Sequence, residues 1–179
     1  MFAMTNRCLL VVDVQEGLFS TPRHDGDALI VRLNRLASLF RAAGNPVIYV
    51  QHCGAEGDAL HPSQPGYALF SALEVESDDL RIAKESCDAF LNTTLAATLE
   101  NLGRRQLVVT GFATEFCVDT TIRSALAHGF EAIVPADGHT TADRPHLPAH
   151  QIIEHHNATW PWLVSPVGGA RMTRCADLG

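Results

Sequence analysis

Cys117 lies where an apolar strand gives way to a helix. Residues 108–123 read VVTGFATEFCVDTTIR; the first of them predict a buried strand, Gly111 ends it, and Thr114 is of the type that caps helix starts. With Thr114 as the cap, Cys117 falls in the first helical turn, where free backbone N–H groups and the positive end of the helix dipole stabilise a thiolate. This stretch alone leaves two interpretations open: a sulfur nucleophile, or a buried structural cysteine of the kind that most free cysteines are.

Two further side chains with acid–base chemistry lie at the ends of predicted strands. Asp13 stands near the end of the apolar run 8–14, which is typical of a central parallel strand, although strand propensity disfavours aspartate. Lys84 ends a shorter predicted strand over residues 80–84. A carboxylate could take a proton from a thiol, and an ammonium could stabilise the resulting charge. The structural alternatives are a turn or cap at Asp13, and an ordinary ion pair between Asp13 and Lys84.

Strands and helices alternate along the chain. The apolar runs predict strands over residues 8–14, 47–51, 80–84, 107–109, 132–136 and 162–164. Helical spacing predicts helices over residues 27–43, 95–102, 114–128 and 148–157. Such alternation produces right-handed crossovers and a parallel sheet that is covered on both faces. Ligands of these sheets bind beyond the carboxyl ends of the strands, so Asp13, Lys84 and Cys117 are expected to converge on one site.

The composition is typical of a globular protein and argues against nucleic-acid-binding and membrane-spanning proteins. The 179 residues are 46% hydrophobic and 18% charged, as in an ordinary globular domain, and the net charge of −7 provides no basic surface for nucleic acid. No apolar run approaches the roughly 20 residues of a membrane span, and the start MFAMTNR does not read as a signal peptide. Five dispersed cysteines without a C-x-x-C pair favour reduced thiols. A cytoplasmic protein is the expectation.

Three motifs carry a resemblance to a known family: VVDVQ with Asp13, IAKESCDAF with Lys84, and GFATEFCVDTT with Cys117. In this order and spacing the sequence resembles the isochorismatase-like cysteine hydrolases, which include nicotinamidases, N-carbamoylsarcosine amidases and streptothricin hydrolases. The resemblance runs from Leu10 to about Trp162. It implies one α/β domain over residues 1–179, a three-layer α-β-α sandwich around a mostly parallel, Rossmann-like sheet of six strands in the order 3-2-1-4-5-6.

The resemblance also implies roles for individual residues. Cys117 would attack a carbonyl carbon and form a thioester, Asp13 would move the proton, and Lys84 would hold Asp13 and offset negative charge. The backbone N–H groups of Ala113 and Cys117 would form the oxyanion hole. The family places a cis peptide bond before this alanine, here between Phe112 and Ala113.

The substrate pocket is less clearly marked in the sequence. The loop 52–67 is rich in Gly, Pro and His, and loops of this length often bind ligands. The candidates for lining the pocket are Gln15, Phe19, His52, Phe112 and His139.

The family resemblance bears on metal binding as well. Nicotinamidases bind a metal ion through an Asp-x-His motif after the second strand, and here His52 and Gly54 stand in those two positions. The nicotinamidase metal site is therefore expected to be absent, and no cofactor is expected. His52 and His61 remain as an alternative pair of donors.

These observations favour a metal-independent cysteine hydrolase that cleaves a small amide or ureido C–N bond. The alternatives are vinyl-ether hydrolysis of isochorismate, which needs no sulfur nucleophile, and a non-catalytic thiol redox sensor on the same fold. The expected partners are a small-molecule substrate and further copies of the chain, in a homodimer or homotetramer, with no nucleic acid or membrane.

Overall fold

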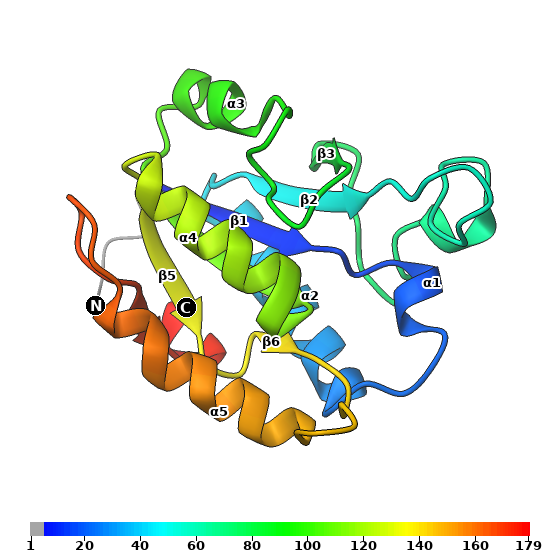
Figure 1. Cartoon of the computed structure of the whole chain (residues 1–179). Helices are drawn as coiled ribbons and strands as arrows, with labels where there is room; N and C mark the ends of the chain where they lie inside the picture. Colours follow the sequence, from blue (N-terminus) through cyan, green and yellow to red (C-terminus); the bar gives the residue numbers. More distant parts are fainter. Residues whose placement is uncertain (1–5) are drawn as a thin grey trace.

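A parallel sheet runs through the middle of the computed structural model, which describes residues 6–179 (Figure 1). Its strands are β1 (Arg7–Val12), β2 (Val47–His52), β3 (Leu80–Lys84), β4 (Gln106–Phe112), β5 (Glu131–Pro135), β6 (His139–Thr140) and β7 (Arg171–Thr173). The order is β3-β2-β1-β4-β5-β7, and the short β6 pairs with β4 beyond the end of β5. This order confirms the predicted topology, with one strand more than expected.

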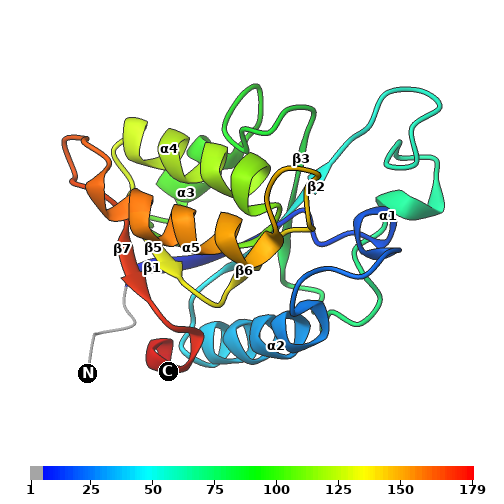
Figure 2. The same cartoon turned by 60° about the horizontal axis from the view of Figure 1, so that its bottom comes forward.

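Helices cover both faces of the sheet, as Figure 2 shows. One face carries α2 (Gly26–Ala42), and the other carries α3 (Leu95–Asn101), α4 (Asp119–Ala127) and α5 (Ala149–Thr159). Short helical turns complete the chain: α1 (Glu16–Phe19), η1 (Pro65–Tyr67), η2 (Thr114–Val118), η3 (Trp160–Trp162) and η4 (Cys175–Leu178). The three-layer sandwich is therefore confirmed. No helix within residues 6–179 combines the length and apolarity that a membrane crossing requires.

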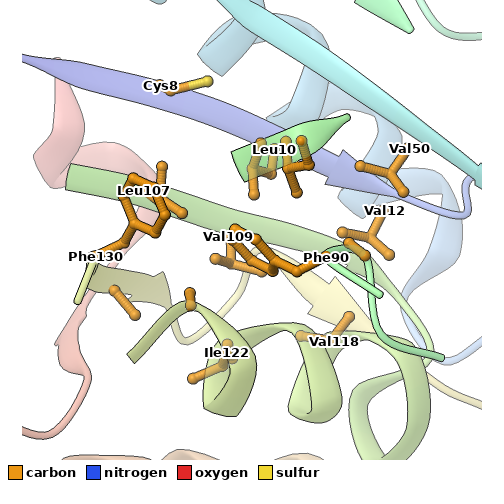
Figure 3. Packing of buried hydrophobic residues seen from close by; sticks show 14 of the residues in the cluster. Cys8, Leu10, Val12, Val50, Phe90, Leu107, Val109, Val118, Ile122 and Phe130 are labelled. Carbon is orange, nitrogen blue, oxygen red and sulfur yellow. The ribbon is translucent and has the colours of Figure 1, made fainter. Parts of the chain in front are cut away.

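The continuous apolar runs of the strands follow from this double coverage. In β1, Leu10 faces the core beneath α4, where Ile122 packs (Figure 3), while Leu9 faces the core beneath α2, where Leu33 packs. Successive side chains of a strand point to opposite faces, so a strand buried on both sides needs apolar residues at every position. β1 is buried at all of its positions.

The last predicted strand is wrong. Residues 162–164 do not pair with the sheet; Trp162 ends the helical turn η3 with 84% of its surface exposed. The final strand is β7, which pairs with β5 through Val134 and Met172. The apolar run at Trp162 is short and follows a proline, whereas Trp160 is the residue that enters the core. The sequence-based prediction also missed α1 and β6, which are too short to show a period.

Gly111 allows β1 and β4 to approach each other at the carboxyl end of the sheet. It adopts φ +115°, and a Cβ there would lie 2.1 Å from the Val12 carbonyl oxygen. We expect Gly111→Ala to lower the free energy of unfolding by about 2–3 kcal/mol, through backbone strain and overpacking together. Gly44→Ala is the control, because Gly44 has φ +69° but nothing within 4 Å, and should cost about 1 kcal/mol. If urea unfolding shows that the two variants lose the same free energy of unfolding, the close approach of the backbone at Gly111 is contradicted.

Candidate active site

The three side chains singled out in the sequence meet at the carboxyl end of the sheet. Lys84 Nζ donates to Asp13 Oδ2 at 2.7 Å and to Cys117 Sγ at 3.3 Å. A third bond, to the Ser86 carbonyl oxygen at 2.9 Å, fixes the ammonium in place. Asp13 and Lys84 are almost completely buried, whereas Cys117 is partly exposed. One ammonium therefore contacts both a buried carboxylate and an accessible sulfur.

Asp13 leaves the strand in an unusual backbone conformation. Its φ of +53° lies in the left-handed region, which aspartate tolerates better than most residues, while its N–H still donates to the Val50 carbonyl at 2.8 Å. The chain therefore turns at Asp13 immediately after β1 ends at Val12. This position accounts for an aspartate at the end of an otherwise apolar strand.

Cys117 lies in the wide helical turn η2, which precedes α4. The N–H groups of Phe116 and Val118 both donate to the Ala113 carbonyl, at 3.0 and 3.2 Å. The predicted capping role of Thr114 is wrong, because Ala113 occupies the cap position and the Thr114 hydroxyl contacts His139 instead. The Phe112–Ala113 peptide bond is cis, the conformation that the family resemblance implies. Cys117 is thus presented at the start of a helix, as expected, but by a different turn.

Burial controls the protonation of the three groups. Desolvation raises the pKa of Asp13, against the opposing charge of Lys84. Desolvation also raises the pKa of the Cys117 thiol far above its usual range; the charge of Asp13 adds to this and that of Lys84 opposes it. For Lys84, burial alone would lower the pKa, but the nearby Asp13 and Cys117 outweigh burial and raise it. Burial and the charge of Asp13 therefore favour the protonated thiol, whereas Lys84 and the helix start favour the thiolate.

This electrostatic balance predicts opposite effects of two substitutions on thiol reactivity. Asp13→Asn removes the negative charge that raises the pKa of Cys117 but keeps Lys84, so alkylation of Cys117 by iodoacetamide at about pH 8 should accelerate tenfold or more. Lys84→Met should slow it. Peptide mass spectrometry separates Cys117 from the other cysteines. Rates that change in neither variant would mean that burial and the helix start, and not these two charges, set the pKa of the thiol.

Gln15 holds the start of the loop 52–67 and has no free polar group for a substrate. Its amide nitrogen donates to the carbonyls of His52, at 3.1 Å, and Tyr67, at 2.9 Å, and its amide oxygen accepts from the His52 N–H at 2.8 Å. The side chain is fully buried. Gln15 therefore supports this loop, and its predicted place in the substrate pocket stays a prediction.

His139 is likewise enclosed within the protein. Its Nε2 lies 3.0 Å from Asn157 Oδ1, and its Nδ1 lies 2.9 Å from the Thr114 hydroxyl. Because Asn157 uses its amide nitrogen to donate to the Ala136 carbonyl, its oxygen must accept, which places the imidazole proton on Nε2. Burial lowers the pKa of His139 to about 4, so the ring is neutral. Nδ1 thus contacts the turn before Cys117 and Nε2 contacts α5, so both nitrogens are engaged within the protein. The predicted contact with substrate stays a prediction.

Two aromatic candidates lie together beside the active-site turn. The rings of Phe19 and Phe112 are 5.7 Å apart in an edge-to-face contact, and the Arg23 guanidinium lies 4.8 Å from the centre of the Phe112 ring. Phe19 also lines a cavity of about 650 Å³ with Phe70. The residues lining that cavity do not include the Asp13–Lys84–Cys117 group, whereas Lys84 lines a separate cavity of about 360 Å³. The aromatic pair thus joins α1, which carries Phe19, to the end of β4, which carries Phe112.

Comparisons with known proteins agree with this arrangement. Residues 7–159 match the family model described as the isochorismatase domain. The chain belongs to the isochorismatase family. A solved isochorismatase family protein with 32% sequence identity superposes on it with a TM-score of 0.85, covering 96% of this chain and 99% of that one.

Curated relatives of the family include named hydrolases. A streptothricin hydrolase of Streptomyces noursei is 35% identical over 144 residues, which cover 79% of this chain and 57% of the relative. The ureidoacrylate amidohydrolase of Methylobacterium radiotolerans is 30% identical over 167 residues, which cover 72% of this chain and 65% of the relative. The chain thus spans little more than half the length of the streptothricin hydrolase that it matches.

The donors for a nicotinamidase-type metal ion do not fit here. Gly54 replaces one ligand of the family motif, and Asp58 fills the space beside it, within 2.6 Å of a Cβ built there. The Nδ1 of His61 is already 2.7 Å from the Ser63 hydroxyl. Within residues 6–179, no three His, Cys, Asp or Glu side chains are grouped so that they could hold a metal ion.

Two supporting contacts had no signal in the sequence. The Ser86 carbonyl that binds Lys84 is a backbone group, which any residue type supplies. Asn157, which fixes the tautomer of His139, lies 18 positions further along the chain in α5. Such partners are recognised only when the fold brings the segments together.

Proposed function

We propose that this isochorismatase-family protein is a cysteine hydrolase that cleaves a small amide or ureido C–N bond. The observation that carries the proposal is the Lys84 ammonium, which binds both the Asp13 carboxylate and the Cys117 sulfur. A thiol, a buried proton acceptor and a fixed cation are the groups that acyl transfer to sulfur requires.

The proposed reaction has two halves. Asp13 takes the proton of Cys117 as the sulfur attacks the carbonyl carbon, and the backbone N–H groups of Ala113 and Cys117 receive the negative oxygen. The C–N bond then breaks, the leaving nitrogen takes the proton from Asp13, and a thioester remains on the sulfur. Water, deprotonated by Asp13, attacks the thioester; the carboxylic acid leaves and the sulfur recovers its proton. Because burial raises the pKa of Asp13, this carboxyl is a stronger base than an ordinary aspartate.

The two alternatives lack such support. Redox sensors use thiols with a depressed pKa, whereas burial raises the pKa of Cys117. Hydrolysis of a vinyl ether proceeds by protonation and gives the sulfur no role. The names of the streptothricin hydrolase and the ureidoacrylate amidohydrolase also favour hydrolysis as the reaction class.

Ammonia release tests the proposal. The purified protein is incubated with a panel of small carboxamides and ureido acids, and intact-protein mass spectrometry then looks for an acyl group on Cys117 after a rapid acid quench. We expect ammonia release and an acyl adduct that hydroxylamine removes. Formation of pyruvate from isochorismate, with no ammonia from any amide, would favour the vinyl-ether reaction instead.

The proposed setting is the cytoplasm, which the five free cysteines support. The proposed assembly is a homodimer or homotetramer. Trp162 and Val164 support it, because they are 84% and 98% exposed on one apolar segment. Sedimentation velocity measures the assembly, and a monomer at micromolar concentration would contradict it.

A further inference from the structure

His52 occupies the last position of β2, on the catalytic face of the sheet. Ile48 and Val50 of the same strand belong to the core beneath α4, and alternation places His52 on that face too. Its direct neighbour in register on β3 is Lys84, which follows Ile82 on the same face. The imidazole therefore extends beside the ammonium that binds Asp13 and Cys117.

The backbone of His52 is held in place, while its buried ring nitrogen Nδ1 is left without a partner among the described residues. Gln15 binds both the N–H and the carbonyl of His52, at 2.8 and 3.1 Å, so the backbone is fixed. The Nδ1 atom is buried and has no hydrogen-bond partner within residues 6–179. By contrast, His61, His139 and His156 each have a bonded Nδ1. A buried polar atom without a partner calls for a physical explanation, and a ligand supplies one.

A second unpartnered atom belongs to the same site. Asp13 Oδ1 is also buried without a hydrogen bond in this part of the chain. His52 is the register neighbour of Lys84, and Lys84 binds Asp13, so both unpartnered atoms belong to side chains grouped around one ammonium. In the proposed reaction, Asp13 delivers a proton to the nitrogen that leaves. His52 thus borders the position at which that nitrogen must lie.

We infer that His52 Nδ1 accepts an N–H of the leaving nitrogen, so that the site selects amides whose leaving nitrogen carries at least one N–H. The inference rests on the proposed function. A neutral imidazole with its proton on Nε2 presents Nδ1 as an acceptor. The contact turns the nitrogen so that its lone pair faces the proton of Asp13. Amides whose nitrogen carries two alkyl groups lack the N–H and leave His52 Nδ1 unpaired.

The test compares two leaving groups on one acyl group. A primary amide and the methyl ester of the same acid form the same thioester on Cys117, but the ester has no N–H for His52. We expect His52→Leu to lower kcat/KM for the amide by about 10- to 100-fold and to change kcat/KM for the ester by less than about threefold. His52→Asn, whose oxygen replaces Nδ1, should restore most of the amide activity.

His61→Leu is the matched control, because it makes the same chemical change in the same loop at a ring already bonded to Ser63. It should leave both activities unchanged. An equal loss of amide and ester hydrolysis in His52→Leu would assign the residue a structural role and overturn the inference, as would no loss at all. If the wild-type protein forms no thioester, the proposed function itself fails and the inference fails with it, which the mass of the quenched protein shows directly.

Discussion

Replacing Cys117 with alanine should reduce amide turnover by at least about 10⁴-fold while the protein stays folded. In the proposed mechanism, the sulfur is the atom that forms the covalent intermediate, so the proton transfers of Asp13 have no acyl group to act on without it. The side chain is small and partly exposed, so its loss opens little space in the core. Ammonia release with the best substrate of the panel measures the activity, and thermal unfolding measures the fold.

Cys87→Ala is the matched control for this experiment. Cys87 is an exposed cysteine near enough to influence the pKa of Cys117, but it makes no contact with Lys84 or Asp13 among the bonds described. It should keep full activity. Cys117→Ser should be nearly as inactive as Cys117→Ala, because a hydroxyl holds its proton more tightly than a thiol. Substantial turnover in purified Cys117→Ala would rule out the thioester.

Lys84→Met should lower the free energy of unfolding by about 3–5 kcal/mol and abolish turnover. The side chains of Asp13 and Lys84 are 2% and 0% exposed, so the substitution leaves a buried carboxyl without its counter-ion. The pKa of Asp13, already raised by burial, should rise further. A group whose pKa is raised by folding loses its stabilising contribution as the pH increases through that pKa. The difference from wild type should therefore be large at neutral pH and shrink as the carboxyl protonates in acid.

The double substitution Asp13→Asn with Lys84→Met separates stability from activity. It removes both charges, so it should recover much of the lost stability while remaining inactive. Arg123→Met is the control, because Arg123 pairs with Asp119 on the surface with 47% of its side chain exposed, and should cost less than about 1 kcal/mol. Urea unfolding over a range of pH measures all four proteins. A loss of less than about 1 kcal/mol in Lys84→Met would contradict a buried pair.

The sequence by itself determined the order of the elements and which residues reach the catalytic edge. A strand whose residues are apolar at successive positions must be covered on both faces of the sheet. Parallel strands also bring their carboxyl ends to one edge of the sheet. Asp13, Lys84 and Cys117 stand at or beyond three of those ends, so local pattern was enough to bring them together. The last strand failed because its apolar run was short, and packing placed Trp160 in the core instead.

Only the tertiary structure decided the state of the sulfur. The position of Cys117 at a helix start favours a thiolate, but burial and the charge of Asp13 oppose it more strongly, and neither acts through neighbouring positions in the chain. The surroundings of the histidines could not be predicted from neighbouring positions in the chain either. His52 ends β2 and His139 begins β6, yet His139 is enclosed by Thr114 and Asn157, while Nδ1 of His52 has no partner within residues 6–179. Hydrogen-bond partners far apart in the sequence make that difference, because they become neighbours only in the folded chain.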